Sequence, residues 1–141
     1  MHSICRRTRG VTLIELMIAI AIVAIITAIA LPNFLADHRH ARRADANASL
    51  IRIVEAQERY RSSHQTYTDT LGDLGLSSST SQNLYSIALS TSALTASTTF
   101  VVTFTAKNGT SQSGDTGCTT MKVTVSSGNF TYAQPSCSSA T

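Results

Sequence analysis

The sequence lacks the short motifs on which several large classes of enzyme depend. It contains no Gly-x-Ser-x-Gly nucleophile elbow, which exposes a serine for acyl transfer, and no glycine-rich phosphate-binding loop. His38, His40 and His64 follow the apolar N-terminal run, and none has the spacing of metal ligands, so we expect them on the surface. We therefore predict a protein that is not an enzyme, with no catalytic residues, no metal and no cofactor.

Cations are scarce in the part of the chain that follows the apolar run. The formal net charge is +3, but Arg6, Arg7 and Arg9 precede the run, and without them basic and acidic residues are equal in number. Beyond residue 63 only Lys107 and Lys122 remain, against three aspartates. Because nucleic-acid binding depends on lysines and arginines that neutralise phosphates, we do not expect nucleic acid as a partner. The three acids lack the dense spacing of a calcium loop, and we interpret them as loop residues: Asp69, Asp73 and Asp115.

The three cysteines fall into two groups. Cys5 lies among the N-terminal arginines, whereas Cys118 and Cys137 lie near the C-terminus. In an exported chain the C-terminal pair is the expected disulfide, and closing the loop 118–137 would stabilise the fold by about 3 kcal/mol. The alternative is a pair of free, buried thiols.

Residues 11–31 form an apolar run long enough to cross a membrane. At about 1.5 Å per residue this helix spans roughly 31 Å, close to the apolar thickness of a bilayer. The arginines that precede it predict a cytoplasmic N-terminus, with the rest of the chain exported. A second basic patch, Arg39, Arg42 and Arg43, follows several residues beyond the run. This patch is either a contact for lipid headgroups or a neighbouring subunit, or a solvated helix face.

Two residues do not suit an ordinary membrane anchor. Glu15 places a carboxylate inside the apolar run, where an ionised acid is costly without a partner. Gly10 separates the arginines from the run. A cut after Gly10 would create an α-amino group on Val11, four residues before Glu15, and that amine could supply the countercharge within the chain or from a neighbouring subunit.

The residues around this position, Arg-Gly-Val-Thr-Leu-Ile-Glu-Leu from Arg9 to Leu16, resemble the class III signal of type IV prepilins and pseudopilins. The resemblance implies that prepilin peptidase removes the leader, residues 1–10, by cutting after Gly10. It also implies that Val11 becomes the N-methylated terminus, that Glu15 pairs with a neighbouring subunit during assembly, and that residues 11–35 form a transmembrane helix that becomes the filament core. Phenylalanine is usual in the family where this chain has Val11.

A different processing route is open. Ala28-Ile29-Ala30 fits the small-x-small pattern that ordinary signal peptidase recognises after an apolar segment. The chain would then begin at Leu31 and be secreted. Glu15 argues against this route, because a plain signal peptide has no use for a buried acid.

The fold class predicted from the rest of the chain is α+β. One helix is expected over residues 11–62, because an apolar stripe continues through Leu50, Ile53, Val54, Gln57 and Tyr60, and Pro32 is its single internal breaker. Three or four short strands are expected, at 85–89, 99–106, 119–125 and, as the fourth, 129–133, with turn signals at Asn108-Gly109 and Gly128-Asn129. The amphipathic half of the helix would cover the small antiparallel sheet, giving a head over residues 36–141.

This order of parts also resembles the type IV pilin head, most closely that of minor pilins of the PilE type. The resemblance implies a structural subunit of a type IV pilus, a minor pilin that primes or joins the filament in pilus assembly, adhesion or twitching motility. Its implied partners are other major and minor pilins through the N-terminal helix, prepilin peptidase and the inner-membrane assembly platform. The chain would be a single-pass inner-membrane protein before it enters the extracellular pilus. The alternatives are a pseudopilin of type II secretion and a minor pilin at the pilus tip that binds DNA or a surface.

Overall fold

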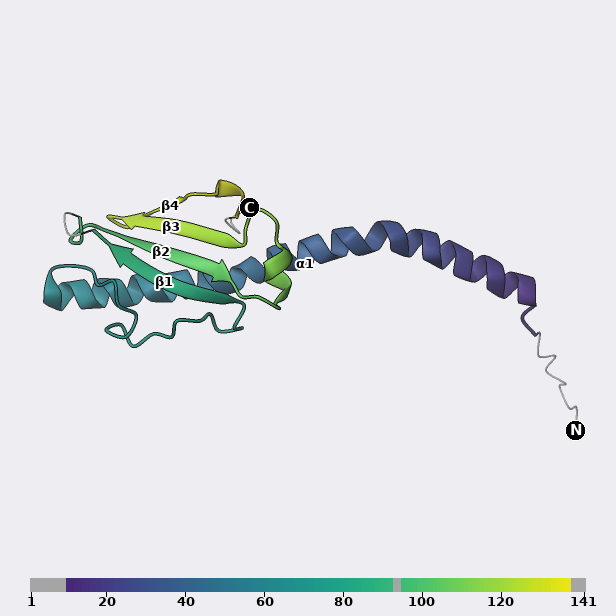
Figure 1. Cartoon of the computed structure of the whole chain (residues 1–141), viewed down its shortest axis with the longest axis horizontal. Helices are drawn as coiled ribbons and strands as arrows, with labels where there is room; N and C mark the ends of the chain where they lie inside the picture. Colours follow the sequence, from purple (N-terminus) through teal and green to yellow (C-terminus); the bar gives the residue numbers. More distant parts are fainter. Residues whose placement is uncertain (1–9, 93–94, 138–141) are drawn as a thin grey trace, which may run out of the picture. The chain divides into compact units, whose positions relative to one another are not determined.

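The computed structural model describes residues 10–92 and 95–137, without the side chains of residues 31–33. The predicted leader, apart from Gly10, and Cys5 lie outside the described residues. In the described part of the chain one long helix, α1 (Leu13–His64), is followed by four strands (Figure 1). It divides into two compact units, Met1–Leu35 and Ala36–Thr141, and we call the second unit the head.

Helix α1 runs through Pro32 without interruption, so this structure does not contain the helix break predicted there. Proline removes one backbone donor, whereas the turns on either side keep their own hydrogen bonds, and a long helix tolerates the loss of one.

The sheet is an antiparallel meander in the order β1-β2-β3-β4. Its strands are β1 (Tyr85–Thr91), β2 (Thr99–Ala106), β3 (Thr120–Ser126) and β4 (Asn129–Tyr132). Buried side chains alternate with outer ones along β1, β2 and β3, as expected for a sheet covered on one face. The predicted α+β fold is therefore confirmed.

The two turn signals have different outcomes. The pair Ser126 and Asn129 closes the β3–β4 hairpin, so the turn consists of Ser127 and Gly128, one residue earlier than predicted. Both have positive φ, 49° and 83°, as a tight two-residue hairpin with a right-handed strand twist requires. No direct hairpin forms at Asn108-Gly109, because a short 3₁₀ helix, η1 (Ser111–Gly114), lies between β2 and β3.

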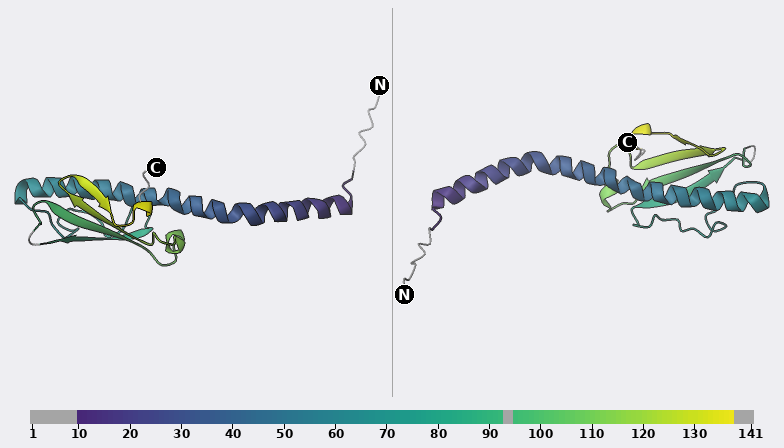
Figure 2. Two further views of the ribbon diagram at one scale, coloured as in Figure 1. Left: turned by 90° about the horizontal axis from the view of Figure 1, so that it is seen from above. Right: turned by 180° about the vertical axis from the view of Figure 1, so that it is seen from behind.

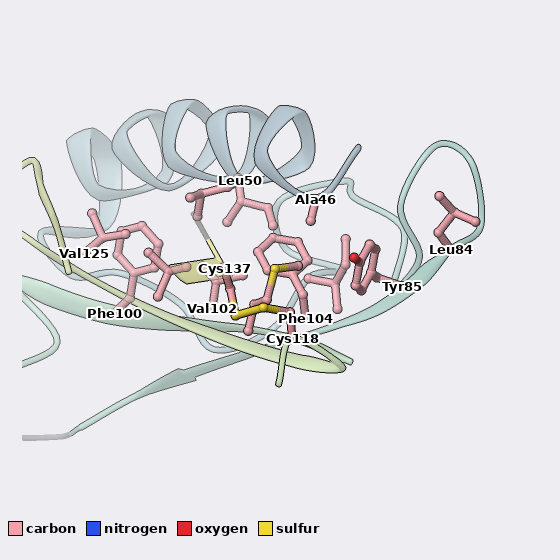
Figure 3. Close-up of a cluster of buried hydrophobic side chains, with 14 of the residues drawn as sticks. Ala46, Leu50, Leu84, Tyr85, Phe100, Val102, Phe104, Cys118, Val125 and Cys137 are labelled. Carbon is pink, nitrogen blue, oxygen red and sulfur yellow. A yellow bond between two sulfur atoms is a disulfide. The ribbon is translucent and has the colours of Figure 1, made fainter. Parts of the chain in front are cut away.

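The core lies between α1 and the inner face of the sheet (Figures 2 and 3). Ala46, Leu50 and Ile53 of α1 are at most 2% exposed, and they face buried side chains of β2 and β3 such as Phe100 and Val125. Burying a large apolar side chain contributes roughly 1.5–3 kcal/mol, so this seam is the main source of the head's stability.

The predicted apolar stripe includes one polar residue that the core accommodates. Gln57 is fully buried, and its side-chain amide donates to the carbonyl of Thr68 at 2.6 Å. The amide oxygen of Gln57 accepts from the backbone N–H of Thr68 at 3.1 Å. The two bonds satisfy the buried amide, and they attach the start of the connection between α1 and β1 to the helix.

Candidate functional site

The first candidate site is the apolar surface of α1. Residues Leu13–Ala30 are long and apolar enough to cross a membrane, and none of this stretch is buried within the chain. Large aliphatic side chains are exposed along it, from Leu13 at 79% to Ile29 at 68%. An apolar surface of this extent needs a cover, and either lipid or the helices of neighbouring subunits can supply one.

The start of this helix has a defined cap. The Oγ1 atom of Thr12 accepts a hydrogen bond from the backbone N–H of Glu15 at 3.3 Å, and the carbonyl of Thr12 accepts from Leu16 at 3.2 Å. Thr12 is thus the N-cap residue, and Glu15 occupies the third helical position. Thr12 was not among the predicted residues, although a threonine three residues before a glutamate is the signature of a capping box.

Gly10 and Val11 precede the helix and are exposed. A Cβ atom added at Gly10 would meet no atom within 4 Å. The packing of the described residues therefore does not require glycine at this position.

The second candidate site is a cluster of polar side chains that holds the loop before β3 and the segment after β4 against α1. The Nε and Nη2 atoms of Arg43 each donate to the carboxylate of Asp115 at 2.8 Å, and Nη1 donates to the carbonyl of Ser136 at 2.9 Å. The side chains of Arg43 and Asp115 are only 11% and 7% exposed. Hydrogen bonding to Asp115 raises the pKa of Arg43 above its usual value. The pair therefore joins α1 to the loop before β3.

We call the pair of Arg43 and Asp115 the clamp, and other hydrogen bonds reinforce it. The Gln112 side-chain amide, which is fully buried, donates to the carbonyl of Arg39 at 3.2 Å and also to the hydroxyl of Tyr85. Arg42 donates to the hydroxyl of Ser111. Arg42 and Arg43, predicted to contact lipid headgroups or a neighbouring subunit or to lie on a solvated face, are therefore engaged within the head.

The two C-terminal cysteines form a disulfide, as the sequence indicated. Cys118 precedes β3 and Cys137 ends the short helix η2 (Pro135–Cys137), with their Cα atoms 5.5 Å apart. Both residues are at most 3% exposed and belong to the core beneath Leu50 (Figure 3). The bond therefore ties the end of the described chain to the start of β3.

The predicted site residues thus lie in two separate parts of the chain. Gly10, Val11 and Glu15 surround the start of α1, whereas Cys118 and Cys137 lie in the core of the head. Among residues 10–92 and 95–137, no group of three His, Cys, Asp or Glu side chains is placed to hold a metal ion. Asp115 binds Arg43, and Asp73 accepts a hydrogen bond from Thr68 at 2.8 Å.

A long helix with an exposed apolar first half and an antiparallel sheet packed on its second half define the type IV pilin fold. Residues 5–31 match the model of the prokaryotic N-terminal methylation motif. Residues 32–122 match the model described as type IV minor pilin ComP, DNA uptake sequence receptor. Because this match covers more than half of the chain, the chain belongs to the family of the type IV minor pilin ComP.

Two curated relatives agree with this assignment. The chain is similar to the type IV major pilin protein PilA of Myxococcus xanthus, with 39% identity over 69 residues, which cover 49% of this chain and 31% of the relative. It is also similar to the type IV wide pilus major component PilA4 of Thermus thermophilus, with 41% identity over 85 residues, 58% of this chain and 65% of the relative. The chain thus spans less than two thirds of each relative.

Proposed function

We propose that the chain is a structural subunit of a type IV pilus, a minor pilin whose N-terminal helix anchors it in the inner membrane and then packs into the filament. The observation that carries this proposal is the uncovered apolar surface of Leu13–Ala30. In the membrane, lipid covers this surface. In the filament, the same helices of neighbouring major and minor pilins replace the lipid, and no catalytic step by the subunit is needed.

Processing after Gly10 is part of the proposal. The N-terminal methylation motif supports it, and so does the exposed backbone of Gly10 and Val11 before the helix begins. Packing does not require glycine at position 10. Prepilin peptidase would require it, because the enzyme would recognise glycine at the cleavage position. Cleavage would remove the leader, residues 1–10, and methylation would follow on Val11.

Glu15 would act in assembly through its position in the first turn of α1. A carboxylate there interacts favourably with the positive end of the helix dipole, which lowers the cost of its charge but does not provide a counterion. The N-terminal amine of a neighbouring subunit would provide it. Pairing would then set the axial register between one subunit and the next, while the apolar contacts supply most of the attraction.

The expected topology follows from the arginines that precede the helix. They would hold the N-terminus in the cytoplasm and place the head in the periplasm, where the disulfide can form and persist. Prepilin peptidase and the inner-membrane assembly platform are the partners expected before the subunit enters the extracellular pilus.

Three variants test this function. Gly10→Val should leave the leader attached, as mass measurement of the purified chain would show. Glu15→Leu should give a processed chain that stays in the membrane fraction and is absent from sheared pili, whereas Glu55→Gln, at an exposed position of α1 in the head, should assemble normally. A chain beginning at Leu31, or Glu15→Leu subunits present in pili at the normal level, would contradict the proposal.

Two alternatives are separable by phenotype. If the chain is a pseudopilin of type II secretion, deleting its gene should abolish enzyme secretion and leave the pili intact. A DNA receptor at the pilus tip is favoured by the match to the family of ComP, a DNA uptake sequence receptor. The charge balance beyond residue 63 opposes it, because three aspartates outnumber two lysines there, and one of the lysines, Lys107, already donates to Ser79 at 2.8 Å. A salt-dependent gel shift with the full chain in detergent micelles, weakened by Lys122→Gln, would favour the DNA receptor.

A further inference from the structure

A cavity of about 220 Å³ lies in the head where α1, the connection before β1 and β1 itself meet. Ile53, Leu76 and Ile87 provide its apolar lining. Ile53 and Ile87 are buried core residues, and Leu76 packs against the same core. One side of the cavity is therefore rigid and apolar.

The opposite side is lined by hydroxyl groups whose oxygens accept hydrogen bonds from the rest of the protein. Ser77 accepts from the backbone N–H of Ser79 at 3.2 Å, and Ser79 accepts from the ammonium of Lys107 at 2.8 Å. Ser81 accepts from Nη1 of Arg52 at 3.0 Å. Within the described residues, none of these three serines donates to another protein atom, so their O–H groups are available to a ligand.

The hydroxyl of Thr80 also accepts hydrogen bonds from the protein. Its Oγ1 atom accepts from the backbone N–H groups of Leu84 and Tyr85, both at 3.2 Å. These two bonds occupy both lone pairs of the hydroxyl and leave only its hydrogen to donate. The polar side of the cavity therefore offers several free hydroxyl donors, although Ser49, which also lines it, donates to the carbonyl of Asp45 at 2.9 Å, and each of the three serines keeps one lone pair.

Arg52 adds a positive charge to this side. It lines the cavity and is exposed, and it forms no salt bridge within the described part of the chain. Only one of its five N–H groups is used there, in the bond to Ser81. A planar guanidinium with free donors matches a carboxylate, whose two oxygens accept side by side.

We propose that this cavity binds a small organic carboxylate that carries a short aliphatic group. The carboxylate would accept from Arg52 and the serine hydroxyls, and the aliphatic group would lie against Ile53, Leu76 and Ile87. An inorganic anion would leave the apolar side unused, and a neutral aliphatic molecule would leave the donors without acceptors, at a cost in desolvation. A free acid and the C-terminal carboxylate of a peptide share this chemistry.

The test uses the full chain in detergent micelles with labelled methyl groups, titrated with isovalerate. The methyl resonances of Ile53, Leu76 and Ile87 should shift and saturate. Isovaleramide has the same shape without the charge, and it should bind about tenfold more weakly or worse. Arg52→Gln should weaken isovalerate binding by about the same factor, whereas Arg59→Gln, at another exposed arginine of α1, should leave it unchanged.

Three results would overturn the inference: no saturable methyl shift, equal binding of isovalerate and isovaleramide, or inorganic phosphate binding as tightly as isovalerate. A peptide that ends in leucine should be tested as the free acid and as the C-terminal amide. Competition with isovalerate by the free acid alone would support the carboxylate site and identify a chain terminus as the source of the carboxylate. Pilus assembly by the Arg52→Gln variant is a separate measurement, so failure of the cavity proposal leaves the proposed function untouched.

Discussion

Asp115→Asn removes one charge from the buried clamp between Arg43 and Asp115 and keeps the shape of the side chain. Arg43 then stays 11% exposed without its counterion, although its bond to the Ser136 carbonyl remains. Breaking a buried pair by removing one partner typically costs 3–5 kcal/mol, because the remaining charge is desolvated and unpaired. Since the bond to Ser136 compensates in part, we expect a loss of about 3 kcal/mol in the free energy of unfolding.

The measurement is urea unfolding of the full chain in detergent micelles, with the disulfide intact, followed by tyrosine fluorescence. Arg61→Gln is the control for an exposed pair, because the side chains of Arg61 and Glu58 are 40% and 41% exposed. It also removes the bond from Arg61 to the Ser97 carbonyl and the contact of Arg61 with the Tyr67 ring, and together these losses should cost about 1–2 kcal/mol. The double variant Arg43→Met, Asp115→Leu should regain at least half of the loss, because no charge is then left buried. A loss below about 1 kcal/mol for Asp115→Asn would refute the buried clamp.

The remaining predictions concern other parts of the head. Burial raises the pKa of Tyr67 to about 12, with a contribution from its hydrogen bond to Glu58. Because the folded state keeps its proton longer than the unfolded state, stability should fall as the pH rises from about 10 to about 12, and Tyr67→Phe should remove this part of the fall in a pH series of unfolding curves. Replacing both Cys118 and Cys137 by serine should cost about 3 kcal/mol, and a reducing agent should produce a similar loss in the unchanged chain but no further loss in the variant. Ser127→Asn should raise stability by up to about 1 kcal/mol, because asparagine tolerates the positive φ of this turn better than serine, and Ser126→Asn, in the adjacent strand, should not.

The elements of the fold were predictable because each has a local signal. The apolar run predicted the exposed segment of α1, and short runs of strand-forming residues between turn signals predicted β2 at its observed bounds, with β1, β3 and β4 correct to within two residues at either end. A helix period and a strand period depend only on neighbouring residues. The cap at Thr12 was equally local, and it could have been found from the threonine three residues before Glu15.

The clamp and the cavity were not predictable in the same way. Arg43 and Asp115 are 72 residues apart, and no periodicity connects them. The basic patch therefore looked like a surface feature until the fold brought the loop before β3 against it. Similarly, the hydrogen bonds of the hydroxyl groups from Ser77 to Ser81 depend on distant partners such as Lys107. Chemistry that two distant segments share becomes visible only in three dimensions.

The disulfide has a consequence for any proteolytic cut in the β3–β4 hairpin. The β3–β4 turn at Ser127 and Gly128 is exposed, and exposed turns are preferred sites of proteolytic attack. A protease that cut there would open the hairpin without releasing either fragment, because the sulfur bridge from Cys118 to Cys137 encloses the cut. The two pieces of a chain cut in this turn would thus stay covalently linked.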